Sequence, residues 1–177
     1  LLQDSQTREV WPVAPGAGVH NARTYQVTHG QGFTRVAHRH ADLAVTATWC
    51  VDANTAIKQV HITLTNHGHR TLQLRLIGLA EWLMGANRSD RATVRTAVLQ
   101  QGGVTALLAT QLERAAGFGQ GTAFLSLADS GTQATDWTCD RREFFDARGR
   151  LVLPDHLGQR SGDGLDPDDI LAADDSN

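Results

Sequence analysis

The sequence predicts an all-β fold, an antiparallel sandwich with at most short helical turns. Apolar and polar residues alternate with a period of two in many short stretches, which is typical of strands that bury one face. Residues that favour turns separate these stretches about every 8–12 positions, as in sandwiches. Helical periodicity is nearly absent, and only residues 111–117 and 154–157 could form a turn or two.

The first predicted strands lie near the N-terminus. Leu1 and Leu2 resemble the end of a strand, so we expect the chain to be a fragment of a longer protein. Residues 25–28 and 33–38 are predicted strands on either side of His29-Gly30-Gln31-Gly32. We predict a turn there because glycine adopts positive φ at no steric cost.

The central region alternates most regularly. Residues 43–51 form one predicted strand, and residues 57–65 form another with three apolar side chains on one face. Asn66-His67-Gly68-His69 supplies turn chemistry, after which alternation resumes at residues 71–79. We predict that 57–65 and 71–79 form an antiparallel pair.

The second half repeats this pattern. Predicted strands at residues 93–99 and 104–110 flank Gln100-Gln101-Gly102-Gly103, which indicates a hairpin. A further strand is predicted at 122–128, and a weaker one at 133–138 leads into a charged segment.

The charges are spread unevenly. The net charge is −3, and no lysine or arginine follows Arg160, whereas six aspartates do. We therefore predict a sandwich domain over residues 1–160 and an acidic tail, or the start of a linker, over residues 161–177. Basic residues elsewhere are scattered, which argues against a nucleic-acid partner. Cys50, in an apolar strand, is expected to be a buried free thiol, and two cysteines form no disulfide framework, which favours a reducing compartment.

The charged segment is the first candidate site. It reads Asp140-Arg141-Arg142-Glu143-Phe144 and directly follows the last predicted strand. Such charges can hold a polar ligand or another subunit. Arginine and carboxylate groups can equally fix a loop through paired hydrogen bonds, and this structural role is the commoner outcome for at least two of the four charged residues.

Three tryptophans are candidates for stacking on a sugar: Trp11, Trp82 and Trp137. An aromatic ring suits the C–H face of a sugar. A tryptophan at the end of an apolar strand more commonly packs over the core.

No metal or cofactor is predicted. His38-Arg39-His40 and His67-Gly68-His69 each place two imidazoles two positions apart, but no cysteine or carboxylate completes a zinc pattern. The glycines at 117, 119 and 121 do not follow a strand and open a helix, so they indicate a flexible connection rather than a phosphate loop.

Six short motifs occur in order along the chain. They are Glu9-Val10-Trp11-Pro12-Val13, residues 25–34, residues 58–66, Glu81-Trp82-Leu83-Met84-Gly85, Asp140-Arg141-x-x-Phe144 and Gly164-Leu165-Asp166-Pro167. Together they resemble the N-terminal β-sandwich of glycoside hydrolase family 94, formerly glycosyltransferase family 36. They are most similar to the phosphorylase-like region of cyclic β-(1,2)-glucan synthases. The chain departs from the family pattern at Cys139, at Asp146 and at Asp168.

The resemblance implies a β-supersandwich of galactose-mutarotase type, here a partial one that lacks some N-terminal strands. In the family this domain precedes an (α/α)6 barrel that carries the catalytic acid, so the resemblance implies no catalytic residue in this chain. It implies a homodimer, a β-glucan or oligosaccharide handled with the parent enzyme, and residues 140–144 as a loop near the sugar site or an interface. It also implies a cytoplasmic location, or the cytoplasmic face of the inner membrane for a membrane-anchored synthase.

Two other functions remain open. A stand-alone carbohydrate-binding module requires exposed aromatic rings, which the three tryptophans would have to supply. A mutarotase-type epimerase requires a histidine and a carboxylate in one cleft for acid–base chemistry, and His29, His61 and Glu81 are the residues to examine.

Overall fold

The computed structural model describes residues 1–16, 24–112, 121–128 and 134–160. Two compact units divide the chain, Leu1–Leu79 and Ala80–Asn177. The regular elements described in both units are antiparallel strands, and the second unit adds two short 3₁₀ turns, η1 (Arg88–Thr93) and η3 (Arg141–Glu143), which confirms the all-β prediction. Among the described residues, none of the helical turns has the length and apolar character of a membrane span.

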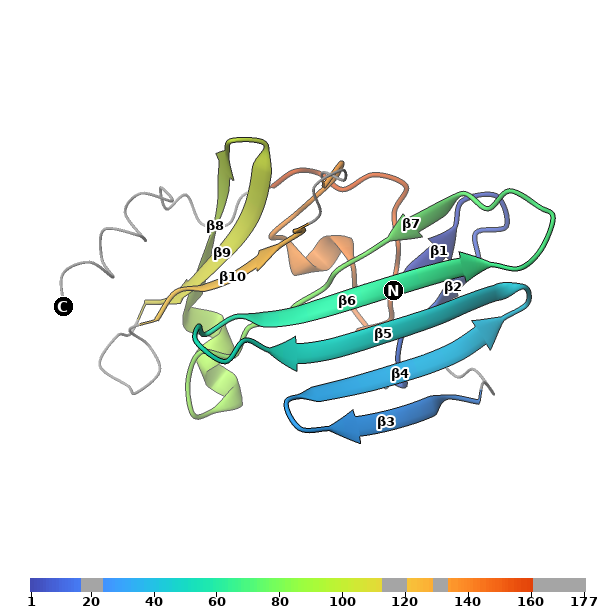
Figure 1. The fold of residues 1–177 in the computed structure, drawn as a ribbon. Coiled ribbons are helices and arrows are strands. Elements are labelled where there is room, and N and C mark those ends of the chain that lie inside the picture. The colour runs from blue at the N-terminus through green and yellow to red at the C-terminus, as the bar shows by residue number, and fades with distance from the viewer. Residues whose placement is uncertain (17–23, 113–120, 129–133, 161–177) are drawn as a thin grey trace. The chain divides into compact units, whose positions relative to one another are not determined.

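The first unit contains two sheets. Its described strands are β1 (Leu2–Asp4), β2 (Val10–Trp11), β3 (Gln26–Gly30), β4 (Phe33–His40), β5 (Leu43–Val51), β6 (Lys58–Asn66) and β7 (Leu74–Leu76). A small sheet has the order β2-β1-β7, and a larger one the order β3-β4-β5-β6 (Figure 1). All neighbours in both sheets are antiparallel.

The larger sheet follows the alternation of the sequence. Strand β5 has the bounds predicted for it, and its residues from Leu43 to Ala47 alternate between buried and half-buried. The β3–β4 turn is shorter than predicted, because His29 and Gly30 belong to β3 and only Gln31 and Gly32 remain between the strands. Gly32 has a φ of 80°, a conformation that favours glycine.

The core of the first unit lies between its two sheets. Leu2 and Trp11 come from the small sheet, Leu43 and Val45 come from β5, and at most 3% of each residue is exposed. Both sheets therefore bury their apolar faces against each other, as sandwich packing requires.

The partner of β7 differs from the prediction. The predicted strand at residues 71–79 shortens to Leu74–Leu76, and it pairs with β1 instead of β6. The Asn66 side chain accepts a hydrogen bond from the Gly68 N–H (3.0 Å) and donates one to the Arg70 carbonyl (2.8 Å). These bonds hold the connection in a loop that carries the chain to the small sheet.

The second unit contains one described sheet, with the order β10-β9-β8. Its strands are β8 (Val94–Gln101), β9 (Val104–Gln111) and β10 (Ala123–Ser126). The predicted hairpin is confirmed, although Gln100 and Gln101 extend β8 and leave a two-residue turn. Gly102 and Gly103 have φ values of 58° and 82°, as the tight hairpin turn with two positive φ angles requires.

The prediction of a strand at residues 133–138 is wrong for residues 134–138, which the structure describes and which form no strand. Side chains of this segment instead bind nearby loops; the Asp136 carboxylate, for example, accepts the Leu157 N–H at 2.6 Å. The predicted helical segment at 111–117 begins on Gln111 of β9, and its residues from 113 onward lie outside the described residues. The glycines at 117 and 119, the acidic tail and the motif at residues 164–167 also lie outside them, so the boundary at residue 160 stays a prediction.

Candidate functional site

The charged segment folds around a short 3₁₀ turn of the second unit, η3 (Arg141–Glu143). Asp140 caps this turn by accepting a hydrogen bond from the Arg142 N–H at 2.9 Å. The Arg142 guanidinium also donates to both carboxylate oxygens of Asp140, from Nε at 2.8 Å and from Nη2 at 2.7 Å. Nη1 of Arg160 approaches the same carboxylate at 3.3 Å.

Glu143 makes a second set of bonds within this segment. Its carboxylate accepts the Thr138 hydroxyl at 3.1 Å and the Gly158 N–H at 2.6 Å. Nε of Arg160 lies 3.3 Å from the Glu143 Oε1 atom. Arg160 thus bridges the two acids, and residues 138–143 are held to residues 158–160. We call Asp140, Arg142, Glu143 and Arg160 the carboxylate cluster.

The cluster perturbs the titration of Asp140. Hydrogen bonds from the Arg142 side chain, and then from its backbone N–H, lower the pKa of Asp140 from 3.8 to about 2, although partial burial opposes this shift. The same interactions raise the pKa of Arg142. Asp140 is therefore held in its charged form as a structural anchor, a state unsuited to a proton donor near neutral pH.

Arg141 points to a different partner. Its Nε forms a short hydrogen bond to Oε1 of Glu81, and its guanidinium carbon lies 4.4 Å from the centre of the Phe145 ring. Nη1 of Arg91 lies 3.6 Å from the other Glu81 oxygen. The Glu81-Trp82 motif and the Asp140-Arg141 motif, about 60 positions apart, thereby meet in one place. The sequence identified both motifs but not their contact.

The remaining predicted residue of the segment belongs to the interior. Phe144 is 5% exposed, and its carbonyl accepts the Val152 N–H at 2.7 Å. Arg141 is the charged residue of the segment that lies outside the carboxylate cluster, and its side chain is 54% exposed. Arg142 is more exposed, at 86%, but its guanidinium is paired with Asp140 within the cluster.

The three tryptophans lie in different surroundings. Trp11 is 1% exposed and packs against His40, with ring centres 4.2 Å apart. It therefore offers no open ring to a sugar. Trp82 and Trp137 are half-buried. They retain some exposed surface, as a stacking role would need.

The two histidines considered for an epimerase both lie in the larger sheet of the first unit. His29 of β3 lies opposite Thr34 of β4, which lies opposite Trp49 of β5. His61 of β6 lies opposite Thr48, the neighbour of Trp49. Because paired residues share a face and successive residues alternate, His29 and His61 project to opposite faces of the sheet. Glu81 belongs to the other unit.

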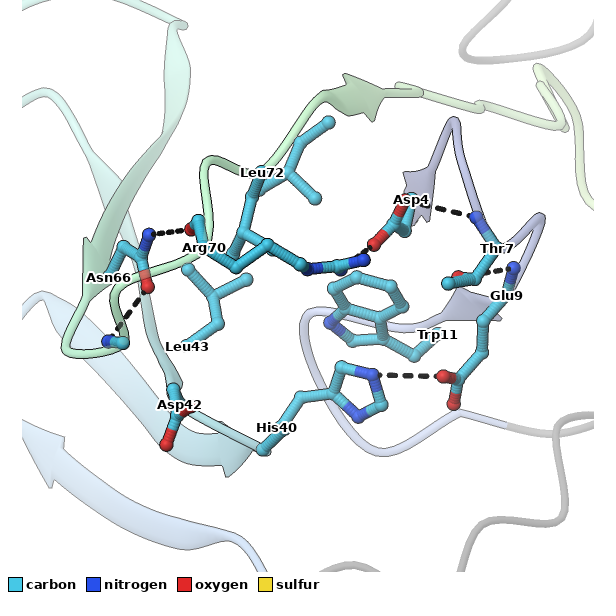
Figure 2. Close-up of a pocket in the computed structure, with 13 residues that line it drawn as sticks. Asp4, Thr7, Glu9, Trp11, His40, Asp42, Leu43, Asn66, Arg70 and Leu72 are labelled. Carbon is cyan, nitrogen blue, oxygen red and sulfur yellow. Dashed lines mark hydrogen bonds and ion pairs between the residues drawn. The ribbon is translucent and has the colours of Figure 1, made fainter.

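A small pocket of the first unit was not predicted. It has a volume of about 180 Å³ and is formed by the β1–β2 and β4–β5 turns and the connection after β6 (Figure 2). Trp11 lines it and lies between the His40–Glu9 pair (3.1 Å) and the Arg70–Asp4 pair.

Most polar groups of this pocket are used within the fold. The Asp4 carboxylate accepts the backbone N–H groups of Gln6 at 2.8 Å and Thr7 at 3.2 Å. The first of these bonds is the largest cause of the lowered pKa of Asp4, and Arg70 contributes further. The pocket is thus a polar junction between the turns. Its sequence signal was His40, one of the histidines singled out in the sequence, which ends β4 and lines the pocket. No group of three residues able to hold a metal ion occurs among the described residues.

The Glu81–Arg141 contact leads to a prediction about stability. Both side chains are more than a third exposed, so Glu81→Gln should cost no more than about 1 kcal/mol of unfolding free energy at low salt. The cost should shrink in high salt because ions screen exposed charges. Urea unfolding of both proteins at low and high sodium chloride measures it.

Arg91→Gln is the matched control, because it removes only the longer contact to Glu81 and should cost less. A loss of several kcal/mol that does not respond to salt would show that Glu81 does more than pair with exposed arginines.

Comparison with known proteins supplies a family match. The model of a family described as "Glycosyl hydrolase 94, supersandwich domain" matches residues 1–172. A curated relative, "Cyclic beta-(1,2)-glucan synthase NdvB" of Rhizobium meliloti (strain 1021), is 28% identical over 130 residues. These residues cover 73% of this chain but 4% of the relative. No solved structure matches the chain significantly.

Proposed function

This chain belongs to the glycosyl hydrolase 94 supersandwich family, and from that premise we propose that it is an accessory, carbohydrate-associated domain. Its parent protein would be a β-glucan phosphorylase or a cyclic β-(1,2)-glucan synthase, and its role would be dimerisation and shaping of the sugar site. The observation that carries this proposal is the family match over residues 1–172, together with the similarity to a named glucan synthase. The chain spans only a small part of that relative, so catalysis is assigned to the rest of the parent.

The bonding of the charged segment supports a non-catalytic role. Glycoside cleavage uses a carboxylic acid that gives up a proton, commonly one with a raised pKa. Asp140 has a lowered pKa, and Glu143 is held by Thr138, Gly158 and Arg160. Both acids suit anchoring of a loop better than proton transfer.

Arg141 supports a role beside a sugar site. The carboxylate cluster fixes the backbone of the turn, and Glu81 and Phe145 orient the Arg141 side chain. A rigid turn that presents an oriented guanidinium can donate to sugar hydroxyls or phosphate oxygens of a site completed elsewhere in the parent. We propose that the parent protein works in the cytoplasm, or on the cytoplasmic face of the inner membrane if it is a membrane-anchored synthase.

A stand-alone carbohydrate-binding module is the second candidate, since Trp82 and Trp137 are only half-buried. Trp11 does not support it, because its ring is covered. His29 and His61 project to opposite faces of the larger sheet, so no more than one of them could belong to a mutarotase-type site.

Calorimetric titration of this chain with β-(1,2)-gluco-oligosaccharides and, separately, with phosphate tests the proposal. We expect weak binding of the oligosaccharide and no release of sugar products on long incubation. Arg141→Ala should weaken the binding, whereas Arg150→Ala, which removes an exposed arginine paired with Asp146, should not.

Two results would count against the accessory role. Turnover of the oligosaccharide by the chain alone would contradict the non-catalytic assignment. Binding that survives Arg141→Ala but is lost in Trp82→Ala and Trp137→Ala would favour the carbohydrate-binding module. No heat at millimolar ligand would leave dimerisation as the remaining role.

A further inference from the structure

Strand β6 forms an outer edge of the larger sheet. The sheet order is β3-β4-β5-β6, so β6 pairs with β5 on one side, and no described strand pairs with its other side (Figure 1). Eight of its nine residues are exposed and one, Ile62, is half-buried. An edge of this kind leaves a row of backbone N–H and C=O groups able to bind a further strand.

This edge lacks the features by which proteins usually block such pairing. Its register with β5 runs without a bulge from Lys58 to Asn66. The strand contains no proline, and its single charged residue, Lys58, stands at one end. Natural edge strands are commonly short or carry charges, prolines or bulges near their middle. The other edge of the sheet, β3, has only five residues and ends at Gly30.

The sequence of β6 is complementary to itself. About a centre at Ile62, an antiparallel copy would place Val60 opposite Leu64, His61 opposite Thr63 and Lys58 opposite Asn66. No like charges meet in this register. Val60 and Leu64 are 48% and 38% exposed, so pairing would bring two exposed apolar side chains together on each side of the centre.

We propose that β6 binds β6 of a second copy of this chain, antiparallel and centred on Ile62, which joins the two larger sheets into one continuous sheet. A two-fold axis through Ile62 makes the contact the same for both copies, as in most homodimers. A register shifted by one residue would turn the apolar residues of one copy toward the polar face of the other, so the register is specified. This inference rests on the dimerisation part of the proposed function and names its surface.

Cross-linking tests the register directly. In a background with Cys50→Ser and Cys139→Ser, Ile62→Cys should form a disulfide-linked dimer on mild oxidation. Opposite Cα atoms of an antiparallel pair are about 4.5–5.5 Å apart, which lies within the usual range for a disulfide. His61→Cys and Thr63→Cys should each cross-link poorly alone but well when mixed. Val27→Cys on the other edge is the control for an exposed strand residue and should not cross-link.

Charge substitution tests the same contact without cysteine. Val60→Lys with Leu64→Lys places lysines opposite each other at two positions and should raise the dissociation constant of the dimer on the order of tenfold or more. Val60→Lys with Leu64→Glu instead creates two opposite-charge pairs and should restore association. Sedimentation velocity measures the constant, and circular dichroism confirms that each variant is folded.

Each outcome separates the inference from the wider proposal. A dimer that neither cross-links at Ile62→Cys nor responds to the paired lysines overturns pairing through β6 and leaves dimerisation standing. A chain that stays monomeric at every concentration overturns both. Equal cross-linking at Val27→Cys would mean that exposed edges associate without the proposed register, which also overturns the inference.

Discussion

Trp11→Ala is expected to lower the unfolding free energy of the first unit by about 3–5 kcal/mol. Trp11 is 1% exposed and belongs to the core cluster with Leu2, Leu43 and Val45, and its ring also packs on His40. The substitution removes a large apolar side chain that packs between the two sheets, and it leaves a cavity there. Because small domains are stable by only about 5–15 kcal/mol, this single change should shift a large part of the unit toward the unfolded state.

Urea unfolding followed by circular dichroism measures this effect. Trp49→Ala is the matched control, since Trp49 belongs to the same unit but is only half-buried. Its loss should cost about 1–2 kcal/mol, in proportion to the smaller area that it removes from water. Similar costs for the two variants would contradict the view that Trp11 joins the two sheets.

Asp140→Asn is expected to lower the unfolding free energy of the second unit by about 1–2 kcal/mol at pH 7. The amide keeps the size of the side chain but loses the charge that attracts Arg142 and Arg160. The Asp140 side chain is 12% exposed, whereas both arginines are mostly exposed, and water around them reduces the cost. The hydrogen bond from the Arg142 N–H, by which residue 140 caps the 3₁₀ turn, should weaken as well.

The effect of this substitution should depend on pH. The pKa of Asp140 in the folded protein, about 2, lies below its usual value of 3.8. A lowered folded pKa means that the stabilisation is fully present above pH 3.8 and is lost as the pH falls through about 2. The difference between the native protein and Asp140→Asn should therefore be constant near neutral pH and shrink in acid.

Unfolding curves between pH 2 and pH 7 test this expectation. Comparison with Asp140→Asn isolates one group, since Asp4, Asp52 and Asp146 also have lowered pKa values and lose stabilisation in acid in both proteins. Asp42→Asn controls for the loss of one negative charge at an exposed position. A difference that grows below pH 4 would contradict the assigned direction of the Asp140 shift.

The strands of the larger sheet were predictable because their signal is local. Strand β5 was predicted with its observed bounds, and β6 was displaced by one residue. Alternation reports which residues face a core, and it survives without knowledge of the partner strand. The predicted partner of β7 was wrong for the same reason, since alternation does not identify the partner strand. Three alternating leucines fit an edge of either sheet, and the loop held by Asn66 decided between them.

The candidate site was predictable as a list of residues but not as an arrangement. The segment from Asp140 to Phe144 was identified, yet its members divide among a cluster of paired charges, an arginine bound to Glu81 and a buried ring. Nothing local distinguishes Arg141 from Arg142. Their roles differ because the 3₁₀ turn directs one toward Asp140 and the other toward Glu81.

The amino-acid sequence alone determined the all-β class, most strand positions and, through six ordered motifs, the family. These properties depend on short-range periodicity and residue identity, which a linear chain displays. Only the tertiary structure decided that Trp11 is a core residue and that Asp140 and Glu143 anchor a loop. It likewise decided that His29 and His61 face apart. Burial, charge pairing and sheet register arise from contacts between residues far apart in the chain, and those contacts exist only once the chain has folded.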